Sequence, residues 1–194
     1  MNEDIFIHKS AFVDDVSLLK KGTKVWHFSH IMRRVEIGEF CNIGQNVFIA
    51  ENVVVGNNVK IQNNVSLYSG LKIEDNVFIG PSAVFTNISV PRSEVNRRDN
   101  YINTIIKEGA SIGANCTIIC GNTIGSYSLI GAGSVVTKST DPYSINVGNP
   151  TKKIGWISEY GEKLSFKNNL AKCNHSGILY KIENGIVNKI NDEI

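Results

Sequence analysis

The histidines and cysteines of this sequence could do chemistry, as proton carriers or as zinc ligands. The candidates are His8, His27, His30, His175, Cys41, Cys116, Cys120 and Cys173. A catalytic zinc site needs three protein ligands around an open position. His27 and His30 have no plausible third partner, and Cys173 with His175 lacks a second pair, so no metal site is predicted.

A second candidate is the polar segment 86–104, TNISVPRSEVNRRDNYINT. Arg92, Arg97 and Arg98 give it a local positive charge, and guanidinium groups suit phosphates because they donate several hydrogen bonds in a fixed plane. The segment interrupts the repeat described next, and an insertion in a repeat protein often supplies the binding face. Two interpretations stay open, a phosphate-binding loop and a solvated surface loop.

The element that must position these residues is a repeat of six. Reading every sixth residue from Ile7 to Phe85 gives fourteen large apolar residues in register, and the phase resumes from Ile106 to Val136. The position two residues earlier is mostly small or β-branched. Side chains two apart on a strand share a face, so each unit is a short strand with two inward residues. A period of six excludes a helix, and the sequence predicts an all-β protein.

Glycine often follows the large residue, and asparagine or aspartate is frequent nearby. These residues tolerate the positive φ angles that turn a corner, so three strands and three corners are expected to close into a triangular coil of about 18 residues. Twenty repeats then give about seven coils, stacked at about 4.8 Å into a parallel prism about 30 Å tall. The glycines are Gly38, Gly44, Gly56, Gly80, Gly113, Gly125 and Gly131.

One inward position is clearly polar. Asn122 has Thr104 and Thr140 one coil away on the same face. Because buried amides must be paired, the three side chains are expected to satisfy one another as a structural stack.

The prism is expected to occupy residues 1–140, with the inserted loop at 86–104, and residues 141–194 form a tail of the same domain. Pro142 and Pro150 are expected to end strand pairing. The stretch GILYKIENGIVNKI alternates around an Asn-Gly pair, which predicts a small C-terminal β-hairpin.

Composition narrows the partners and the compartment. A net charge of +2 gives no reason to expect nucleic acid or a membrane as partner. The N-terminal MNEDIFIHKS is expected to be neither a secretory signal nor a transit peptide. The four cysteines show no dense framework, so reduced thiols and a cytoplasmic location are expected.

The stretch IGANCTIICGNTIGSYSLIGAGSVVTKSTDPYSINVGNPTKKIG resembles the last coils of hexapeptide-repeat acyltransferases. The segments VWHFSHI, IGQNVFI, KIQNNVSLY, FIGPSAVFTN and PRSEV resemble one subgroup, the nucleotide-sugar 3-N-acetyltransferases. The resemblance covers residues 7 to about 165 and implies a left-handed parallel β-helix. Members of the subgroup acetylate UDP-2-acetamido-3-amino-2,3-dideoxyglucuronate or dTDP-3-amino-3,6-dideoxyhexoses. It therefore implies acetyl-CoA-dependent N-acetylation of a UDP- or dTDP-linked sugar, for a bacterial surface polysaccharide.

The same resemblance points to Asn87, because the subgroup places an asparagine beside the acceptor amine. Asparagine cannot take a proton but can orient an amine, and a sugar amine with a pKa of about 8 is partly neutral already. Many relatives use a histidine as general base. His27 lies 60 residues before Asn87, about three coils or roughly 16 Å, which is too far for proton transfer at one centre. Asn87 is the catalytic candidate, and a plain corner residue is the alternative.

Counting by 18 groups other residues at the corners. Arg33 lies in a stack below Asn87 and is expected to meet pyrophosphate or base, since a nucleotide-sugar is long enough to lie along such a ridge. Tyr68 is expected to reach the ligand, and Arg92 is a candidate for a carboxylate or phosphate.

A second corner stacks His27, Gln45 and Asn63. His27 and Trp26 are expected to contact the nucleotide end of the substrate. The competing interpretation is that asparagine and glutamine simply form ladders at the corners.

For acetyl-CoA, the resemblance implies that pantetheine lies along the upper coils. Gly131 and Ala132, with Gly133, would permit close backbone approach, and Lys138 and Lys153, with Lys152, are candidates for the CoA phosphates. Relatives are trimers with sites between prisms, so a homotrimer is implied as well.

Three other functions compete with N-acetylation. A sugar O-acetyltransferase keeps the fold, but a hydroxyl needs deprotonation far more than an amine does, and no base lies near the loop. A β-helical zinc hydratase lacks its third ligand. A purely structural solenoid gives no reason for the arginine-bearing loop.

Overall fold

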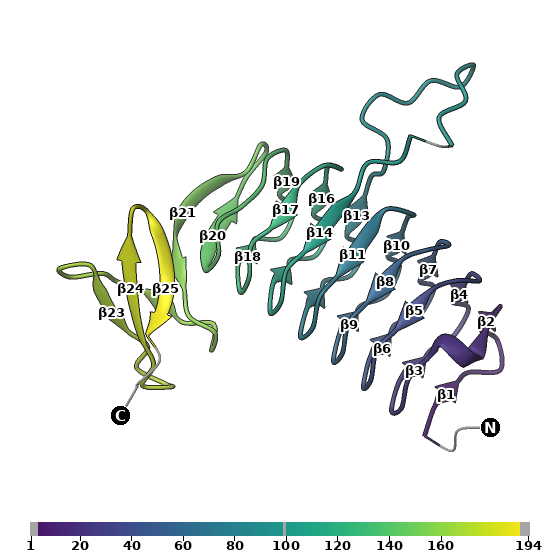
Figure 1. The fold of residues 1–194 in the computed structure, drawn as a ribbon, viewed down its shortest axis with the longest axis horizontal. Coiled ribbons are helices and arrows are strands. Elements are labelled where there is room, and N and C mark those ends of the chain that lie inside the picture. The colour runs from purple at the N-terminus through teal and green to yellow at the C-terminus, as the bar shows by residue number, and fades with distance from the viewer. Residues whose placement is uncertain (1–3, 99, 191–194) are drawn as a thin grey trace.

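The computed structural model describes residues 4–98 and 100–190, and most of them form a stack of triangular coils (Figure 1). Residue 99 of the inserted loop and residues 191–194 of the tail lie outside the described part. Three parallel sheets form the sides of the prism. Most strands have two residues, and a short 3₁₀ helix, η1 (Val16–Leu18), lies in the first coil. The predicted all-β parallel solenoid is confirmed.

Each side of the prism takes one strand from each coil. The first face contains β1 (Phe6–Ile7), β3 (Lys24–Val25), β6 (Asn42–Ile43), β9 (Lys60–Ile61), β12 (Phe78–Ile79), β15 (Ser111–Ile112), β18 (Leu129–Ile130) and β20 (Ser144–Val147). The second face contains β2 (Phe12–Val13), β4 (His30–Ile31), β7 (Phe48–Ile49), β10 (Ser66–Leu67), β13 (Val84–Phe85), β16 (Thr117–Ile118) and β19 (Val135–Val136). The third face contains β5 (Glu36–Ile37), β8 (Val54–Val55), β11 (Leu71–Ile73), β14 (Thr104–Ile106) and β17 (Thr123–Ile124).

Hydrogen bonds between coils set the register. Lys24 pairs with Asn42 at the equivalent position of the next coil, and the amide of Gly44 donates to the carbonyl of Ile61 at 2.8 Å. The pairing is kept across the inserted loop, where Val84 faces Thr117. The loop therefore lengthens one coil without disturbing the stacking of the strands on either side of it.

The prism extends further toward the C-terminus than the six-residue repeat predicted. Leu129 pairs with Ile145, whereas an exact repeat would pair it with Val147, so the last coil is shortened and its strand β20 falls out of phase. The described part of the first face has eight parallel strands, against about seven coils predicted. Pro142 and Pro150 flank β20 in turns, and the prediction that they end strand pairing was wrong.

The predicted inward residues are the core. From Leu19 to Val136, every large residue of the six-residue series is at most 3% exposed, and Ile7 and Val13 pack against them at the N-terminal end. Small polar inward residues bond the neighbouring coil instead of water. The thiol of Cys41 donates to the carbonyl of Gly56 at 3.1 Å, and burial raises its pKa. This cysteine is structural.

Asn122 is buried as predicted, but its partner differs. Its Nδ2 donates to the carbonyl of Ile119 at 2.8 Å. The hydroxyls of Thr104 and Thr140 accept from backbone amides of neighbouring turns. Backbone groups, rather than one another's side chains, are therefore the partners of Asn122, Thr104 and Thr140 in these bonds.

The corner glycines serve a different purpose from the one predicted. The seven predicted glycines do not have positive φ. A Cβ on Gly113 would meet the backbone nitrogen of Ala132 at 2.5 Å, and one on Gly38 would meet the carbonyl oxygen of Gly56 at 2.5 Å. Glycine is required there because adjacent coils touch.

Positive φ falls two residues later, mostly on asparagine. Asn46, Asn64 and Asn115 have φ of 58°, 61° and 56°. One coil departs from this rule at all three corners, with Phe28, Arg34 and Phe40 in the same conformation, which costs a branched or bulky side chain about 1–2 kcal/mol.

The tail adds antiparallel strands. β20 pairs with β21 (Lys152–Ile157), which pairs with β22 (Lys163–Leu164). A separate sheet contains β23 (Leu170–Lys172), β24 (Leu179–Glu183) and β25 (Ile186–Ile190). The predicted hairpin is β24–β25, with Asn184 and Gly185 at positive φ in its turn. No helix in the described part is long and apolar enough to cross a membrane.

Glu162 fastens the tail sheet to the strands before it. Its carboxylate accepts hydrogen bonds from the thiol of Cys173 at 3.2 Å, the amide of Asn174 at 2.7 Å and Nδ1 of His175 at 3.3 Å. The Cys173 thiol first, and then Asn174 and His175, lower the pKa of Glu162 to about 2.

The close contact between coils predicts the effect of a methyl group. Gly113→Ala should lower the free energy of unfolding by about 2–3 kcal/mol, because the coils must move apart. Gly133→Ala, which has open space around it but a φ of 72°, should cost only about 1 kcal/mol. Equal losses in urea unfolding would show that contact between coils is not the reason for glycine.

Glu162→Gln should lower the melting temperature at neutral pH, with a deficit that shrinks as the pH falls below about 4.5. The folded-state pKa of about 2 lies below the ordinary 4.5, so the stabilisation is complete above 4.5 and is lost on acidification toward 2. Glu94→Gln in the exposed loop is the control. A deficit that is independent of pH would contradict the role of the carboxylate charge.

Candidate functional site

Two corners of the prism carry most of the residues predicted to bind the sugar nucleotide. The first, here the histidine ridge, joins the first face to the second and consists of residues 26–28, 44–46 and 62–64. The other, here the arginine ridge, joins the second face to the third and consists of residues 32–34, 50–52, 68–70 and 86–87. The second face lies between the two ridges.

Asn87 lies half-buried at the base of the inserted loop. Its carbonyl accepts from the amide of Ile102 at 2.9 Å, which closes the neck of the loop. The hydroxyl of the neighbouring Thr86 accepts from the amide of Cys120 at 2.9 Å, in the coil above. The backbone that carries Asn87 is therefore held by the neck of the loop on one side and by the coil above on the other.

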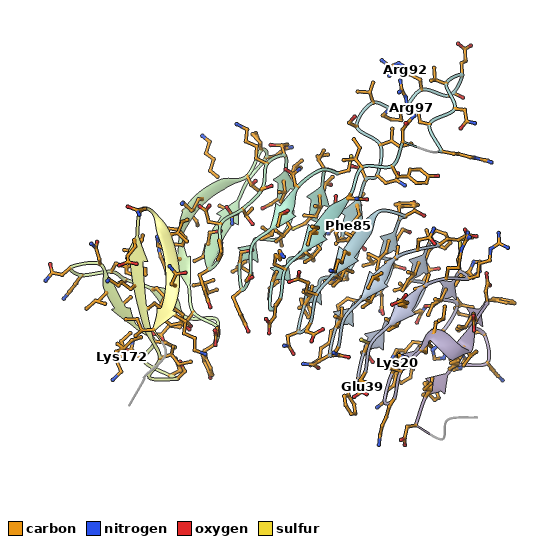
Figure 2. All side chains as sticks on the ribbon, viewed as in Figure 1. Lys20, Glu39, Phe85, Arg92, Arg97 and Lys172 are labelled. Carbon is orange, nitrogen blue, oxygen red and sulfur yellow. The ribbon has the colours of Figure 1, made fainter. Side chains whose placement is uncertain are left out.

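The loop itself projects away from the prism (Figure 2) and carries Arg92 and Arg97. Arg92 is exposed, and its guanidinium donates to the carbonyl of Pro91 at 3.0 Å. Arg97 is half-buried and Arg98 is exposed. The positive charge expected for this segment is present at the surface, in the loop that begins at Asn87.

The arginine ridge holds an ion-pair network. The Nε of Arg33 donates to Glu51 at 2.8 Å, and the guanidinium of Arg34 bonds the other carboxylate oxygen. Arg33 and then Arg34 lower the pKa of Glu51, which stays ionised. The backbone carbonyl of Glu51 accepts from the hydroxyl of Ser69 at 2.8 Å. Arg33, predicted to meet pyrophosphate, is thus held by a carboxylate while its side chain is 69% exposed.

Tyr68 lies on the same ridge, one coil below Thr86. Tyr68 is 40% exposed, and the centre of its ring lies 6.1 Å from that of Phe48 on the second face. Tyr68 and Asn87 therefore lie on the arginine ridge in adjacent coils.

The histidine ridge begins with stacked rings. His27 stacks on His8 with 3.5 Å between centroids, and Trp26 lies parallel to His27. Burial, His27 and Lys9 lower the pKa of His8. In the next coils the backbone amide of Gln45 donates to Oδ1 of Asn63 at 2.8 Å. Trp26, His27, Gln45 and Asn63 are among the residues that line a shallow hollow of about 320 Å³.

His27 and Asn87 are far apart in one chain. His27 precedes β4, whereas Asn87 follows β13, the third strand above β4 on the second face. They also lie on different ridges. His27 therefore cannot carry a proton at a centre beside Asn87 of the same chain.

The residues proposed for acetyl-CoA are distributed over the upper coils. A Cβ on Gly131 would meet Cγ1 of Val147 at 2.7 Å, so this glycine makes room for the last coil of the protein itself. Ala132 and Lys138 are exposed. Lys153 pairs with Asp141 at 2.7 Å and lies 4.3 Å from the centre of the Trp156 ring.

The ion pair of Arg34 and the strained corner at Phe28 were not predicted from the sequence. A signal for both exists in the repeat, since Phe28 stands where the next coils have Asn46 and Asn64, and Arg34 stands where the next coil has Asn52. Asparagine adopts a positive φ with less strain than an aromatic or charged residue does. A residue such as Phe28 or Arg34 at this position therefore indicates a requirement other than low backbone strain. In the described part of the chain, no group of three or more His, Cys, Asp and Glu is placed to hold a metal.

Two known families of repeats match parts of the stacked coils. The family described as bacterial transferase hexapeptide (six repeats) matches residues 52–87, and the hexapeptide repeat of succinyl-transferase matches residues 34–69 and 103–138.

Among characterised relatives, the chain is 44% identical over 92 residues to dTDP-3-amino-3,6-dideoxy-alpha-D-galactopyranose 3-N-acetyltransferase of Aneurinibacillus thermoaerophilus. The match covers 47% of each of the two chains. A second relative, bifunctional protein GlmU of Thermotoga maritima, is 34% identical over 87 residues, which are 41% of this chain and 19% of GlmU. The chain is thus matched over about half the length of the first relative and a smaller part of the second.

Solved structures share the fold. A point mutant of AntD, an N-acyltransferase from Bacillus cereus in complex with dTDP and coenzyme A, superposes with a TM-score of 0.60 at 22% identity, covering 79% of this chain and 83% of AntD. A point mutant of GDP-perosamine N-acetyl transferase from Caulobacter crescentus, with CoA and GDP-perosamine, gives 0.57 at 20% identity, covering 78% and 56%. The stacked coils and the matched segments agree that residues 34–87 and 103–138 carry hexapeptide repeats of the kind described for bacterial transferases.

Proposed function

We propose that the chain transfers the acetyl group of acetyl-CoA to the 3-amino group of a nucleotide-linked amino sugar. The observation that carries the proposal is the 44% identity to a dTDP-3-amino sugar 3-N-acetyltransferase. The geometry supports it, because a fixed asparagine lies at the neck of an arginine-bearing loop, beside a ridge long enough for a nucleotide-sugar.

Acetyl transfer to a sugar amine does not require a strong general base from the protein. A sugar amine is partly neutral near pH 8, so positioning by the side-chain oxygen of Asn87 and a donor for the oxyanion can suffice. The amine attacks the thioester carbonyl, the C–S bond breaks, and the proton lost by the amine passes to the thiolate or to water. Acetyl-CoA is the co-substrate, and the upper coils with Gly131, Ala132, Lys138 and Lys153 are its proposed site.

The second face supports the proposal of a homotrimer. Its outward strand residues carry no lysine, arginine, aspartate or glutamate in the described chain, unlike those of the first and third faces. Phe12 is 73% and Val84 is 50% exposed on it. A face that lacks these charged residues and exposes apolar side chains is typical of a surface that a partner covers.

Threefold packing on this face would bring the two ridges together. In a cyclic arrangement the histidine ridge of one copy lies against the arginine ridge of the next. His27, Gln45 and Asn63 of one copy would then share a groove with Arg33 and Asn87 of the next. The nucleotide would lie along the lower coils, and the amino sugar near Asn87 and Arg92.

The wider setting is also proposed. Free cysteines and the use of acetyl-CoA fit the cytoplasm. The acetylated sugar nucleotide would feed the synthesis of a bacterial surface polysaccharide.

Asn87→Ala should lower kcat for acetyl transfer by about 10²-fold or more, because the amine loses its orienting partner. Free thiol release would be followed with acetyl-CoA and either UDP-2-acetamido-3-amino-2,3-dideoxyglucuronate or a dTDP-3-amino-3,6-dideoxyhexose. Asn188→Ala, on exposed strand β25, is the control. No thiol release by the unaltered protein with either sugar would contradict N-acetylation and favour O-acetylation or another acyl donor.

Val84→Lys should convert the trimer into monomers in light scattering, because it places a charge in a covered, uncharged face. Val54→Lys makes the same change at an exposed valine of the third face and should leave the mass unchanged. A monomeric unaltered protein, or equal effects of the two changes, would contradict assembly through the second face.

A further inference from the structure

A shallow hollow of about 290 Å³ lies where the histidine ridge meets the second face. It is distinct from the hollow around Trp26 on the other side of the ridge. The residues that line it are Phe28, His30, Asn46, Val47, Phe48, Asn64 and Ser66. Aromatic rings form one part of the wall and side-chain amides the other.

Phe28 is not explained by the packing of its own chain. It has a φ of 57° and is 64% exposed. Phe40, with a φ of 54° in the same coil, covers Gly22 of the coil below, where an added Cβ would lie 2.4 Å from the ring. The residue below Phe28 is Ser10, whose hydroxyl accepts from the amide of Phe28 at 3.1 Å. The strained conformation of Phe28 therefore presents a ring to solvent beside the hollow.

The amides beside Phe28 present a donor next to an acceptor. Nδ2 of Asn46 donates to Oδ1 of Asn64 at 3.0 Å. This bond leaves the Nδ2 donor of Asn64 and the Oδ1 acceptor of Asn46 available to a ligand. Both residues are exposed. A planar imide, with its carbonyl beside an N–H, is complementary to such a pair.

The lining of the hollow is otherwise neutral apart from His30. The Nε2 of His30 already pairs with Asp14 at 3.1 Å. The arginines lie on the other ridge and in the loop. A neutral aromatic hollow suits a nucleobase better than a diphosphate, because a base offers a π face for stacking and needs no countercharge.

We infer that this hollow holds the pyrimidine base, uracil or thymine, of the nucleotide-linked sugar, stacked on Phe28 with its imide edge on Asn46 and Asn64. The inference rests on the proposed function. It places the base on the second-face side of the histidine ridge, instead of at Trp26, whose indole N–H is already bonded to Asn42 at 2.8 Å.

The test is calorimetric binding of UDP, dTDP and inorganic pyrophosphate to the full chain. Phe28→Gly should weaken UDP and dTDP by about tenfold or more and leave pyrophosphate unchanged, because base stacking is lost. Its melting temperature should not fall, since glycine accepts the positive φ. The matched control, Phe40→Gly, should lower the melting temperature and leave nucleotide affinity unchanged.

Asn64→Gly tests the amide edge in the same way. It keeps the positive φ and removes the side chain, so it should also weaken UDP and dTDP without affecting pyrophosphate. Asn58→Gly, at the equivalent corner of the third and first faces, is its control.

The outcomes separate the inference from the proposed function. Unchanged nucleotide affinity in Phe28→Gly, or an equal loss for pyrophosphate, would overturn the inference while acetyl transfer stands. ADP binding that Phe28→Gly weakens as much as it weakens UDP binding would also overturn it, because adenine has no imide edge, whereas ADP bound at the proposed CoA site does not contact Phe28. No nucleotide binding and no thiol release with either amino sugar would overturn both.

Discussion

Everything in the molecule depends on hydrogen bonds between backbone groups of successive coils. A two-residue strand is too short to be stable alone, and it persists because amides such as that of Gly44 bond the coil above. The constraint fixes the interior, since only one large apolar residue per repeat fits the axis. It also fixes the corners, where Gly113 approaches Ala132 so closely that no side chain can intervene.

The same constraint decides where function can be placed. Inward residues are committed to the core, so the outward faces, the corners and the inserted loop remain. An inserted loop is compatible with the prism only if the strands before and after it keep their pairing with the neighbouring coils. The hydrogen bond from the amide of Ile102 to the carbonyl of Asn87 joins the two ends of the loop and so preserves that pairing. The candidate catalytic residue thus lies at the point where the repeat is broken and repaired, with the second face and its two ridges beside it.

The sequence predicted the core almost residue by residue. A large apolar residue at every sixth position, with Ile43, Ile61 and Ile79 one coil apart, can only face the interior of a stack of short strands. It missed β20, since the shortened last coil leaves the phase. The hand of the coil does not follow from a period, which either hand would give. For the site, counting along the repeat found the ridges, but the pairing of Arg33 with Glu51 and the exposed ring of Phe28 depend on side-chain directions that spacing does not supply.

The most direct test of the account is complementation between two inactive variants, because the central claim is a site shared by two copies. Asn87→Ala damages the arginine ridge, and a His27→Ala/Asn63→Ala double change damages the histidine ridge. Trimers assembled from an equal mixture should regain about a quarter of the wild-type rate, since about one interface in four would join two intact ridges. Mixed trimers that stay as inactive as either parent would contradict the shared site and place all catalytic groups within one chain.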